Sequence, residues 1–343
     1  MKILHLIYSA AVSGAERYLQ HLLPGLAGHG MECHLVVVTP KRTEEPFTIY
    51  VNEMNALGIK TTLVIAEKRS FILTAKKLKD YLKANDIKIV HSHLFNSDLI
   101  AAVLKMLFYR RVYLLSTKHG YQEKIYEQYE PGKKLRPNDM YWFITRFMLK
   151  RIDKNLAVSR AISNMYMDLG LTKTGYPFVH HGIKIEPFNK EDYREECRKA
   201  DPQLIIVGRI LPLKGHRFLI EAMVKVVEAF PGVKLLVLGE GSEKNHCIEK
   251  VNKLGLQKNI EFLGFKPHPY PFISHSDVII LPSAFEAFGL VYIEAFALKT
   301  PVVAFDTAAG NEIITNNETG LLVEKGNSKT LGDKIIYLLR NRE

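Results

Sequence analysis

Two carboxylates stand in an otherwise apolar stretch near the end of the chain. The segment PSAFEAFGLVYIEAF, residues 282–296, contains Glu286 and Glu294 as its only charges. The run DVIILPS that leads into it is typical of a strand ending at Pro282, so Glu286 falls on the loop that follows. A carboxylate at Glu294 could accept hydrogen bonds from a pair of ribose hydroxyls. The alternative is that one acid is a charge at a helix start and the other lies on a solvated face.

A helix is expected directly after this loop, from about Phe288 to Leu298. Gly289 would let the chain turn tightly before it. The backbone amides of Phe288, Gly289 and Leu290 would then be helix-start donors without intrahelical partners, and such donors suit a phosphate. Glu294 would lie nearly two turns inside this helix.

Cations follow an earlier strand in the same half of the chain. The run IIVGRILPLKG ends a strand and places Arg209 and Lys214 on the next loop, before a helix that begins near His216. Two cations beside a helix start form a reasonable diphosphate clamp, although solvated surface charges are the alternative. The run LVLGEGSEK supplies a similar turn at Gly239, but it lacks the third glycine of a dinucleotide fingerprint, which argues against an oxidoreductase.

These loops need strands and helices in regular alternation to hold them. Strand-like runs separated by helical spacing are KILHLIY, HLVVVT, TTLVIA, IKIVHSH, VYLLSTKH, NLAVS and FVHHG, and then QLIIVGR, VKLLVLGEG, IEFLGF, DVIILPS and PVVAFDT. Such alternation predicts an α/β protein with parallel sheets, whose ligands bind beyond the carboxyl ends of the strands. The strands are too many for one sheet, and the polar stretch at 184–203 separates two groups. We therefore expect two doubly wound domains, 1–185 and 186–343.

Composition narrows the class further. The chain of 343 residues is 47% hydrophobic and 24% charged, as in an ordinary folded protein. Its three cysteines are far apart and odd in number, which favours reduced thiols in a cytoplasm over disulfides or a zinc site. No run of about 18 uncharged apolar residues is present, so the chain is not expected to span a membrane.

The net positive charge of the chain lies in the first half. Residues 1–185 contain 27 basic and 15 acidic side chains, a net charge of +12, whereas residues 186–343 have a net charge of −1. The segment NDMYWFITRFMLKRIDK would place Met140, Phe143, Ile144, Phe147 and Met148 on one arc of a helix. A basic surface is expected beside this arc, formed by Lys133, Lys134, Arg136, Arg146 and Lys150. An amphipathic segment of this kind could dock on anionic lipid, although a core helix with a charged outer face is the alternative. No nucleic-acid motif accompanies the charge, so no nucleic-acid partner is expected.

The ordered motifs resemble the retaining glycosyltransferases of family 4, which have the GT-B fold. The resemblance rests on SGAER, STKHG, GRILPLKG, LGEG, FLGF, the two-glutamate motif and NETGLLV, and it covers most of the chain. Two positions depart from the family: Lys299 stands where a glycine is usual, and the first loop has one glycine, Gly14, where two are frequent. The resemblance implies two Rossmann-like domains facing a central cleft, with the acceptor bound by the first and a nucleotide-sugar by the second.

The resemblance also implies roles for single residues. It implies that Arg209 and Lys214 hold the donor diphosphate, that Glu286 approaches the transferred sugar, and that Glu294 contacts the ribose. It implies that His119, at the end of the strand VYLLSTKH, is an active-site histidine near the sugar. The other donor-binding positions that it implies are Gly14 in a loop that closes over the diphosphate, Gly239, Phe265, Phe288, Gly289 and Leu290.

The expected activity is transfer of a sugar from a nucleoside-diphosphate sugar, with UDP as the expected carrier and with retention at the anomeric carbon. No Asp-any-Asp sequence occurs, so a metal that bridges the diphosphate is not expected. The expected acceptor is a glycan or a lipid-linked molecule, at the inner face of the cell membrane and in cell-surface polysaccharide or glycolipid synthesis. Two alternatives stay open: a non-hydrolysing nucleotide-sugar epimerase on the same fold, and a catalytically silent binding subunit.

Overall fold

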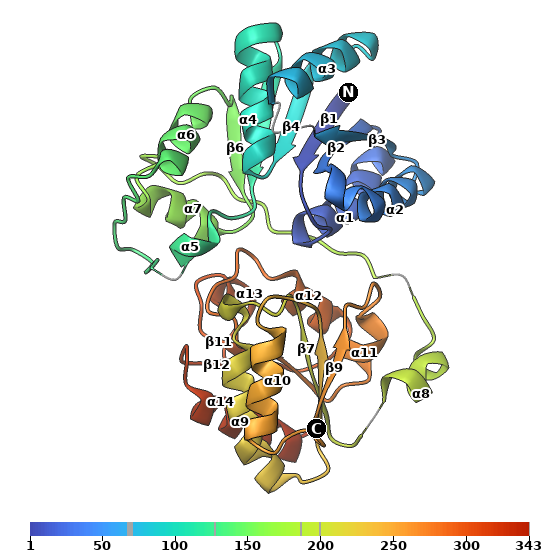
Figure 1. The fold of residues 1–343 in the computed structure, drawn as a ribbon, viewed down its shortest axis with the longest axis vertical. Helices are drawn as coiled ribbons and strands as arrows, with labels where there is room; N and C mark the ends of the chain where they lie inside the picture. The colour runs from blue at the N-terminus through green and yellow to red at the C-terminus, as the bar shows by residue number, and fades with distance from the viewer. Residues whose placement is uncertain (67–70, 127, 186, 199, 343) are drawn as a thin grey trace. The chain divides into compact units, whose positions relative to one another are not determined.

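The chain folds into two compact units (Figure 1). A computed structural model describes residues 1–66, 71–126, 128–185, 187–198 and 200–342. The first unit is Met1–Lys184 and the second is Ile185–Glu343, so the division lies one residue before the expected position. In the described part of the chain, no helix is both long and apolar enough to cross a bilayer.

The first unit is built around a six-stranded parallel sheet in the order β3-β2-β1-β4-β5-β6. Its strands are β1 (Lys2–Tyr8), β2 (Glu32–Pro40), β3 (Lys60–Ala66), β4 (Ile89–His93), β5 (Tyr113–Lys118) and β6 (Lys154–Ala157). Its helices are α1 (Gly14–Gly28), α2 (Glu44–Ala56), α3 (Phe71–Ala84), α4 (Phe95–Val103), α5 (Glu123–Tyr126), α6 (Met140–Leu149) and α7 (Arg160–Asp168), with a 3₁₀ turn η1 (Lys41–Thr43) and a π-helical turn η2 (Leu104–Phe108).

Helices cover both faces of this sheet, because its strands are apolar on both sides. On one face α3, α4 and η2 pack on alternate strand residues such as Leu4 and Leu6. On the other face α1 and α2 pack on Ile7 and on the alternate residues of β2. A parallel sheet buried on both faces is the arrangement that the near-continuous apolar runs predict.

The second unit repeats the same topology. Its parallel sheet has the order β12-β11-β10-β7-β8-β9. The strands are β7 (Gln203–Val207), β8 (Lys234–Leu238), β9 (Ile260–Gly264), β10 (Val278–Leu281), β11 (Val302–Phe305) and β12 (Leu321–Val323). The helical segments are η3 (Lys190–Tyr193), α8 (Arg194–Cys197), η4 (Pro212–Lys214), α9 (His216–Ala229), α10 (Lys244–Lys253), α11 (Tyr270–Ser274), α12 (Leu290–Ala297), α13 (Gly310–Ile313) and α14 (Ser328–Arg340).

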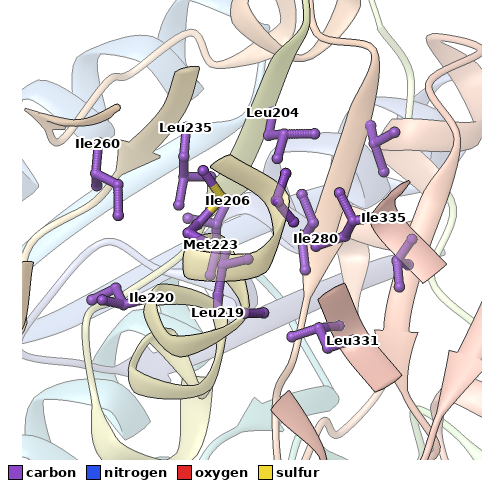
Figure 2. Packing of buried hydrophobic residues seen from close by; sticks show 14 of the residues in the cluster. Leu204, Ile206, Leu219, Ile220, Met223, Leu235, Ile260, Ile280, Leu331 and Ile335 are labelled. Carbon is purple, nitrogen blue, oxygen red and sulfur yellow. The ribbon is translucent and has the colours of Figure 1, made fainter. Parts of the chain in front are cut away.

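The larger core of this unit lies between the sheet and α9, α10 and α14. Figure 2 shows Leu219 and Met223 of α9 and Leu331 and Ile335 of α14 packed against strand residues such as Ile206. A second core on the opposite face includes Tyr292 and Ala295 of α12. Burial of these apolar side chains is the main favourable term that holds the loops at the strand ends in place.

Both sheets reverse their strand order at one point, between β1 and β4 in the first unit and between β7 and β10 in the second. In open parallel sheets, ligands bind beside this switch point, beyond the carboxyl ends of the strands. The expected parallel α/β architecture with doubly wound sheets is confirmed.

One strand prediction was wrong, and one strand was missed. The run FVHHG forms only a single bridge, Ala157 to Phe178, flanked by hydrogen bonds from the amide of Ala157 to Pro177 and from the amide of Val179 to Ala157 at 2.9 Å each. The chain leaves the sheet edge after that contact. Conversely, β12 was not expected, because three residues give too short a period to read; it pairs with β11 at the opposite edge of the second sheet.

Candidate functional site

An ion pair spans the switch point of the second unit. Nζ of Lys214 lies 2.6 Å from Oε1 of Glu286, and both side chains are largely buried, at 22% and 15% exposure. Lys214 ends the short turn that follows β7, and Glu286 lies on the loop after β10. The structure therefore brings together one predicted cation and one predicted carboxylate at the place where this fold binds ligands.

The two loops are held together by backbone contacts. The amide of Ala284 donates to the carbonyl of Leu213 at 2.7 Å. Gly215, the residue after Lys214, has a φ of +73°, and a Cβ built on it would lie 1.8 Å from the carbonyl oxygen of Pro282. Only glycine permits both this left-handed conformation and this approach. The glycine thus sets the distance between Lys214 and Glu286.

The helix after Glu286 begins later than predicted. It is α12, Leu290–Ala297, and Gly289 precedes it with a φ of +89°. Because a residue with positive φ cannot belong to a right-handed helix, Phe288 and Gly289 lie outside it, and Phe288 is buried. Leu290 is therefore the only one of the three predicted donors that lies within α12. The expected phosphate-binding helix start is shifted along the chain but remains beside Glu286.

Glu294 lies inside α12 and is buried, at 1% exposure. A carboxylate in that environment needs hydrogen-bonding partners, because burial of an unpaired charge costs several kcal/mol, on the order of the desolvation of one ion. Its predicted contact with a ribose stays a prediction.

The remaining predicted donor-binding residues follow neighbouring strands. Arg209 comes after β7 and is exposed, Gly239 comes after β8, and Phe265 comes after β9 with 59% of its surface exposed. Backbone hydrogen bonds tie these strand ends together, from Gly208 to Leu238 at 3.0 Å and from Gly239 to Gly264 at 2.8 Å. Since β9, β8, β7 and β10 are adjacent in the sheet, all of these residues lie along one sheet edge.

Packing within the second unit by itself requires a glycine at Gly239. A Cβ at this position would lie 1.9 Å from the carbonyl oxygen of Gly208. The close approach of the two loops after β7 and β8 therefore requires glycine, whatever the residue contacts in a ligand. Next to this edge, His216 is buried, and burial together with the charge of Lys214 lowers its pKa to about 4.

In the first unit, Gly14 is the first residue of α1 rather than part of a loop. Ser13 precedes the helix as its N-cap, and Oε2 of Glu16 accepts from the amide and the hydroxyl of Ser13 at 2.8 and 3.0 Å. This capping box fixes the end of the segment that follows β1. Burial raises the pKa of Glu16. No side chain or backbone of the described residues would contact a Cβ at Gly14.

His119 follows β5 directly and is partly exposed. Its Nε2 lies 3.1 Å from Nδ1 of His93, and the rings of Tyr18 and His181 lie 5.3 and 5.4 Å from it. Burial is the main reason why its pKa falls well below the usual range, and electrostatic interactions with His181 and Lys118 lower it further. His119 is therefore neutral near pH 7 and available as a hydrogen-bonding group.

Three further histidines, His5, His91 and His93, are buried in the sheet near His119. The sequence did not predict a role for them. His5 on β1 faces His91 and His93 on β4, and these two strands flank the switch point. The signal was the alternation HSH in a run predicted to be a strand, which points both side chains to the same face. Among the described residues, these three form the set of potential ligands that could hold a metal ion, with ligand atoms within 4.8 Å of one another.

The end of β5 is anchored by a buried ion pair. Nζ of Lys118 lies 2.5 Å from Oδ2 of Asp98, and the hydroxyls of Ser92 and Ser116 donate to Oδ1 at 2.6 and 2.7 Å. Both charged side chains are almost completely buried. This network joins β4, α4 and β5, and it holds the backbone immediately before His119.

The predicted apolar arc on α6 divides into an exposed and a buried side. Met140, Phe143 and Phe147 are exposed, at 73%, 53% and 41%, whereas Met148 is buried and packs inward with Trp142. The prediction that Met148 lies on the same arc as Met140, Phe143 and Phe147 is wrong, because Met148 is on the inner face of the helix. All five predicted basic residues are exposed: Lys133, Lys134, Arg136, Arg146 and Lys150.

A shallow hollow with more cations adjoins the end of α6. It is lined by Lys105, Met106, Arg110, Lys150, Arg151, Ile152 and Asp153. Lys105 pairs with Asp153 at 2.5 Å, and the guanidinium of Arg151 lies 3.6 Å from the centre of the Phe147 ring. Leu107 beside it is 59% exposed. Basic and apolar side chains are therefore interspersed on one surface of the first unit.

Comparison with known proteins connects both units to sugar transfer. Residues 12–187 match the family model of Glycosyltransferase Family 4, and residues 188–343 match Glycosyl transferases group 1. An uncharacterized glycosyltransferase of Methanocaldococcus jannaschii is 34% identical over 137 residues, which are 39% of this chain and 34% of that protein.

Two further similarities extend over nearly the whole chain. The N-acetylgalactosamine-N,N'-diacetylbacillosaminyl-diphospho-undecaprenol 4-alpha-N-acetylgalactosaminyltransferase of Campylobacter jejuni is 25% identical over 334 residues, 95% of this chain and 86% of that enzyme. The crystal structure of HepE from Anabaena in complex with UDP and glucose superposes with a TM-score of 0.78 at 18% identity, over 100% of this chain and 93% of that one.

The fold similarity confirms the predicted GT-B fold, with its two Rossmann-like units. The family matches cover the chain from residue 12 onward. The chain belongs to the family 4 glycosyltransferases, with a group 1 domain as its second half, and it is a glycosyltransferase.

Proposed function

We propose that the protein is a retaining glycosyltransferase that moves a sugar from a UDP-sugar to a lipid-linked or glycan acceptor at an anionic membrane surface. The observation that carries the proposal is the ion pair between Lys214 and Glu286 at the switch point of the second unit. It places a cation and a carboxylate within reach of one small ligand, where a diphosphate and the sugar attached to it would meet them.

The chemistry needs a stabilised leaving group. The bond between the anomeric carbon and the oxygen of the β-phosphate breaks, and the acceptor oxygen bonds to the same carbon from the same face. The acceptor hydroxyl gives its proton to an oxygen of the departing diphosphate. Lys214, Arg209 and the first amides of α12 would stabilise the negative charge that develops on that diphosphate. Glu286 would orient the transferred sugar.

We also propose that this charge stabilisation needs no divalent metal. The sequence has no Asp-any-Asp, the pattern by which a metal commonly bridges a nucleoside diphosphate to a glycosyltransferase. Two cationic side chains and a helix start supply positive charge from fixed positions, as a metal otherwise would.

Two similar proteins support a UDP-sugar as the donor and a lipid-linked molecule as the acceptor. HepE was crystallised with UDP and glucose, which favours UDP as the carrier. The Campylobacter relative is named for α-transfer of N-acetylgalactosamine to a sugar on diphospho-undecaprenol. A lipid-linked acceptor of that kind lies in a membrane, and the interspersed basic and apolar side chains around α6 suit an anionic bilayer surface.

The test is a transfer assay with a panel of nucleotide-sugars. The purified protein is incubated with each of them and with an undecaprenyl-diphosphate-linked sugar, with and without EDTA, and the anomeric configuration of the product is read by proton NMR. We expect an α-product from a UDP-α-sugar, unaffected by chelator. A β-product would overturn retention, and loss of transfer with EDTA that magnesium restores would overturn metal independence. Conversion of the free nucleotide-sugar to its epimer would identify the epimerase alternative.

A further inference from the structure

We propose that His5, His93 and His119 form a polarised chain of hydrogen bonds that keeps His119 protonated on Nδ1, so that His119 donates to a substrate oxygen rather than acting as a base. His5 and His93 are positioning residues in this assignment. The hydrogen bonds and the tautomer of His119 concern the first unit alone. The expected effect on turnover rests on the proposed function.

The chain is continuous and starts in the interior. Nδ1 of His5 lies 3.2 Å from Nε2 of His93, and Nδ1 of His93 lies 3.1 Å from Nε2 of His119. His5 and His93 are completely buried, whereas His119 is partly exposed. The three rings thus connect the middle of β1 with the carboxyl edge of the sheet.

Each ring in this chain is neutral, because the rings contact one another in the interior and no carboxylate of the described residues pairs with them. Burial lowers the pKa of His5 to about 3, and it lowers those of His93 and His119 well below their usual range. A neutral imidazole has one N–H and one lone pair, on different nitrogens. Two hydrogen bonds among three such rings can therefore run in only two directions.

The direction follows from the inner end of the chain. Nε2 of His5 is buried and has no hydrogen-bond partner among the described residues. If the chain ran inward, this nitrogen would carry an N–H without an acceptor. If it runs outward, this nitrogen carries only a lone pair. A buried N–H without an acceptor is the rarer situation in proteins, so the outward direction is favoured.

The outward direction determines the state of His119. His5 donates from Nδ1 to His93, and His93 donates from Nδ1 to Nε2 of His119. The proton of His119 must then be on Nδ1, which makes no hydrogen bond to the described part of the chain. An N–H at the carboxyl edge of the sheet is a donor for an oxygen of a bound sugar. Proton abstraction by Nε2 is prevented because its lone pair is occupied.

A metal ion at His5, His91 and His93 would have to replace hydrogen bonds that these rings already make. A metal needs an unprotonated nitrogen from each ring, directed at one point. Here Nδ1 of His5 points to His93, and Nε2 of His91 lies 2.7 Å from the hydroxyl of Thr117. Nδ1 of His5 and Nε2 of His91 are thus already in hydrogen bonds.

The tautomer can be measured without any substrate. Long-range proton–nitrogen NMR spectra of protein labelled with ¹⁵N-histidine distinguish Nδ1–H from Nε2–H, and the His119 signals are identified by their loss in His119→Gln. We expect Nδ1–H at His119 in the wild type. An Nε2–H form of His119, or a zinc content of about one ion per chain, would overturn the proposal whether or not the protein transfers sugar.

Substitutions of His93 separate positioning from packing. Asparagine places an amide N–H near the former Nδ1 of His93, so His93→Asn should keep the Nδ1–H form of His119. His93→Leu removes the donor to Nε2 of His119, so the Nδ1–H form should no longer be favoured. The matched control is His91→Gln, which lies on the same strand and keeps the contact with Thr117. It should leave the His119 signals unchanged. Retention of the Nδ1–H form in His93→Leu would contradict the chain. If His93→Leu fails to fold, the spectra of the wild type and of His93→Asn still show whether His119 carries its proton on Nδ1.

Kinetics then test the consequence for turnover. Loss of one oriented donor in an active site lowers kcat by about tenfold or more. We expect that loss in His93→Leu, with recovery in His93→Asn and with unchanged affinity for the nucleoside diphosphate. Equal loss in both variants would assign His93 a packing role. If the wild type transfers no sugar at all, the proposed function fails while the NMR result stands.

Discussion

Lys214 and Glu286, which are 72 residues apart in the sequence, form an ion pair of 2.6 Å between Nζ and Oε1. The cation predicted to bind a diphosphate is thus partly neutralised by the carboxylate predicted to approach the sugar. A diphosphate that binds Lys214 must compete with this carboxylate, and the carboxylate is then released toward the sugar. The two predicted functions are therefore coupled through one contact.

The coupling predicts opposite effects for the two glutamates. Glu286→Gln removes the competing charge from Lys214, so UDP should bind at least as tightly as to the wild type while turnover falls by about a hundredfold. Glu294→Gln should weaken UDP binding by about tenfold, because a charged hydrogen bond to the ribose is lost. Isothermal titration calorimetry with UDP measures both effects. Weaker binding in Glu286→Gln with unchanged binding in Glu294→Gln would exchange their roles.

Gly215→Ala should separate the two loops that carry this ion pair. Its Cβ would lie 1.8 Å from the carbonyl oxygen of Pro282, and its φ of +73° is unfavourable for alanine. We expect UDP binding to fall by more than about tenfold and the second unit to lose about 1–3 kcal/mol of stability. The matched control is Gly232→Ala, because Gly232 has open space around its Cβ position and no positive φ. Equal UDP affinity in both variants would contradict a positioning role of Gly215.

The sequence predicted the alternation of strands and helices well, because apolar runs of 4–7 residues with clear turns identify buried strands. It also placed Lys214 and Glu286 on loops at strand ends. It could not show that the two side chains touch, since that depends on the strand order and on the approach of Gly215 to Pro282.

The histidines of the first unit show the same limit. Only His119 was identified, through the family resemblance. His5 and His93 lie within β1 and β4 and meet through sheet pairing. Local backbone conformation was also hard to read: α12 begins at Leu290 because Gly289 is left-handed, and Lys299 adopts a φ of +57° at the usual place of a glycine.

Asp98→Ala should strongly destabilise the first unit. It leaves the ammonium of Lys118 buried without its carboxylate, and breaking a buried ion pair in this way costs about 3–5 kcal/mol. The single tryptophan of the chain, Trp142, is buried in this unit, so its fluorescence during urea unfolding reports on it selectively. The control is Glu130→Ala, which removes an exposed ion pair with Lys133 and should cost less than about 1 kcal/mol. A loss of the same size in both variants would contradict the structural role of Asp98.

The buried histidines should make the first unit less stable in mild acid. The pKa of His5 is about 3 in the folded state, against about 6.5 when unfolded. The unfolded state therefore binds more protons between these values, and the free energy of unfolding falls as the pH drops below 6.5. One such group removes about 2 kcal/mol between pH 7 and pH 5.

Urea unfolding followed by Trp142 fluorescence at pH 7 and pH 5 measures this loss. His5→Gln should lose about 2 kcal/mol less than the wild type over this interval, because glutamine takes up no proton. Between pH 7.5 and pH 8.5 the free energy of unfolding should depend on pH in the same way in the wild type and in His5→Gln. The same loss in both proteins between pH 7 and pH 5 would mean that His5 is not kept neutral by the fold.

The exposed basic residues around α6 should attach the protein to anionic membranes. Each lysine or arginine near such a surface contributes about 1 kcal/mol, so five together give substantial partitioning. We expect the protein to sediment with vesicles that contain phosphatidylglycerol at low salt. High salt should release most of it, because the screening length falls to about 3 Å at 1 M.

A variant with glutamine at Lys133, Lys134, Arg136, Arg146 and Lys150 should stay in the supernatant at low salt while it binds UDP normally. The matched control carries glutamine at five lysines of the second unit, Lys253, Lys258, Lys325, Lys329 and Lys334, and should sediment like the wild type. Serine at Phe143 and Phe147, which are 53% and 41% exposed, should remove any binding that survives high salt. Because the two five-site variants lose the same charge, equal sedimentation of both would show that net charge, and not the surface around α6, governs attachment.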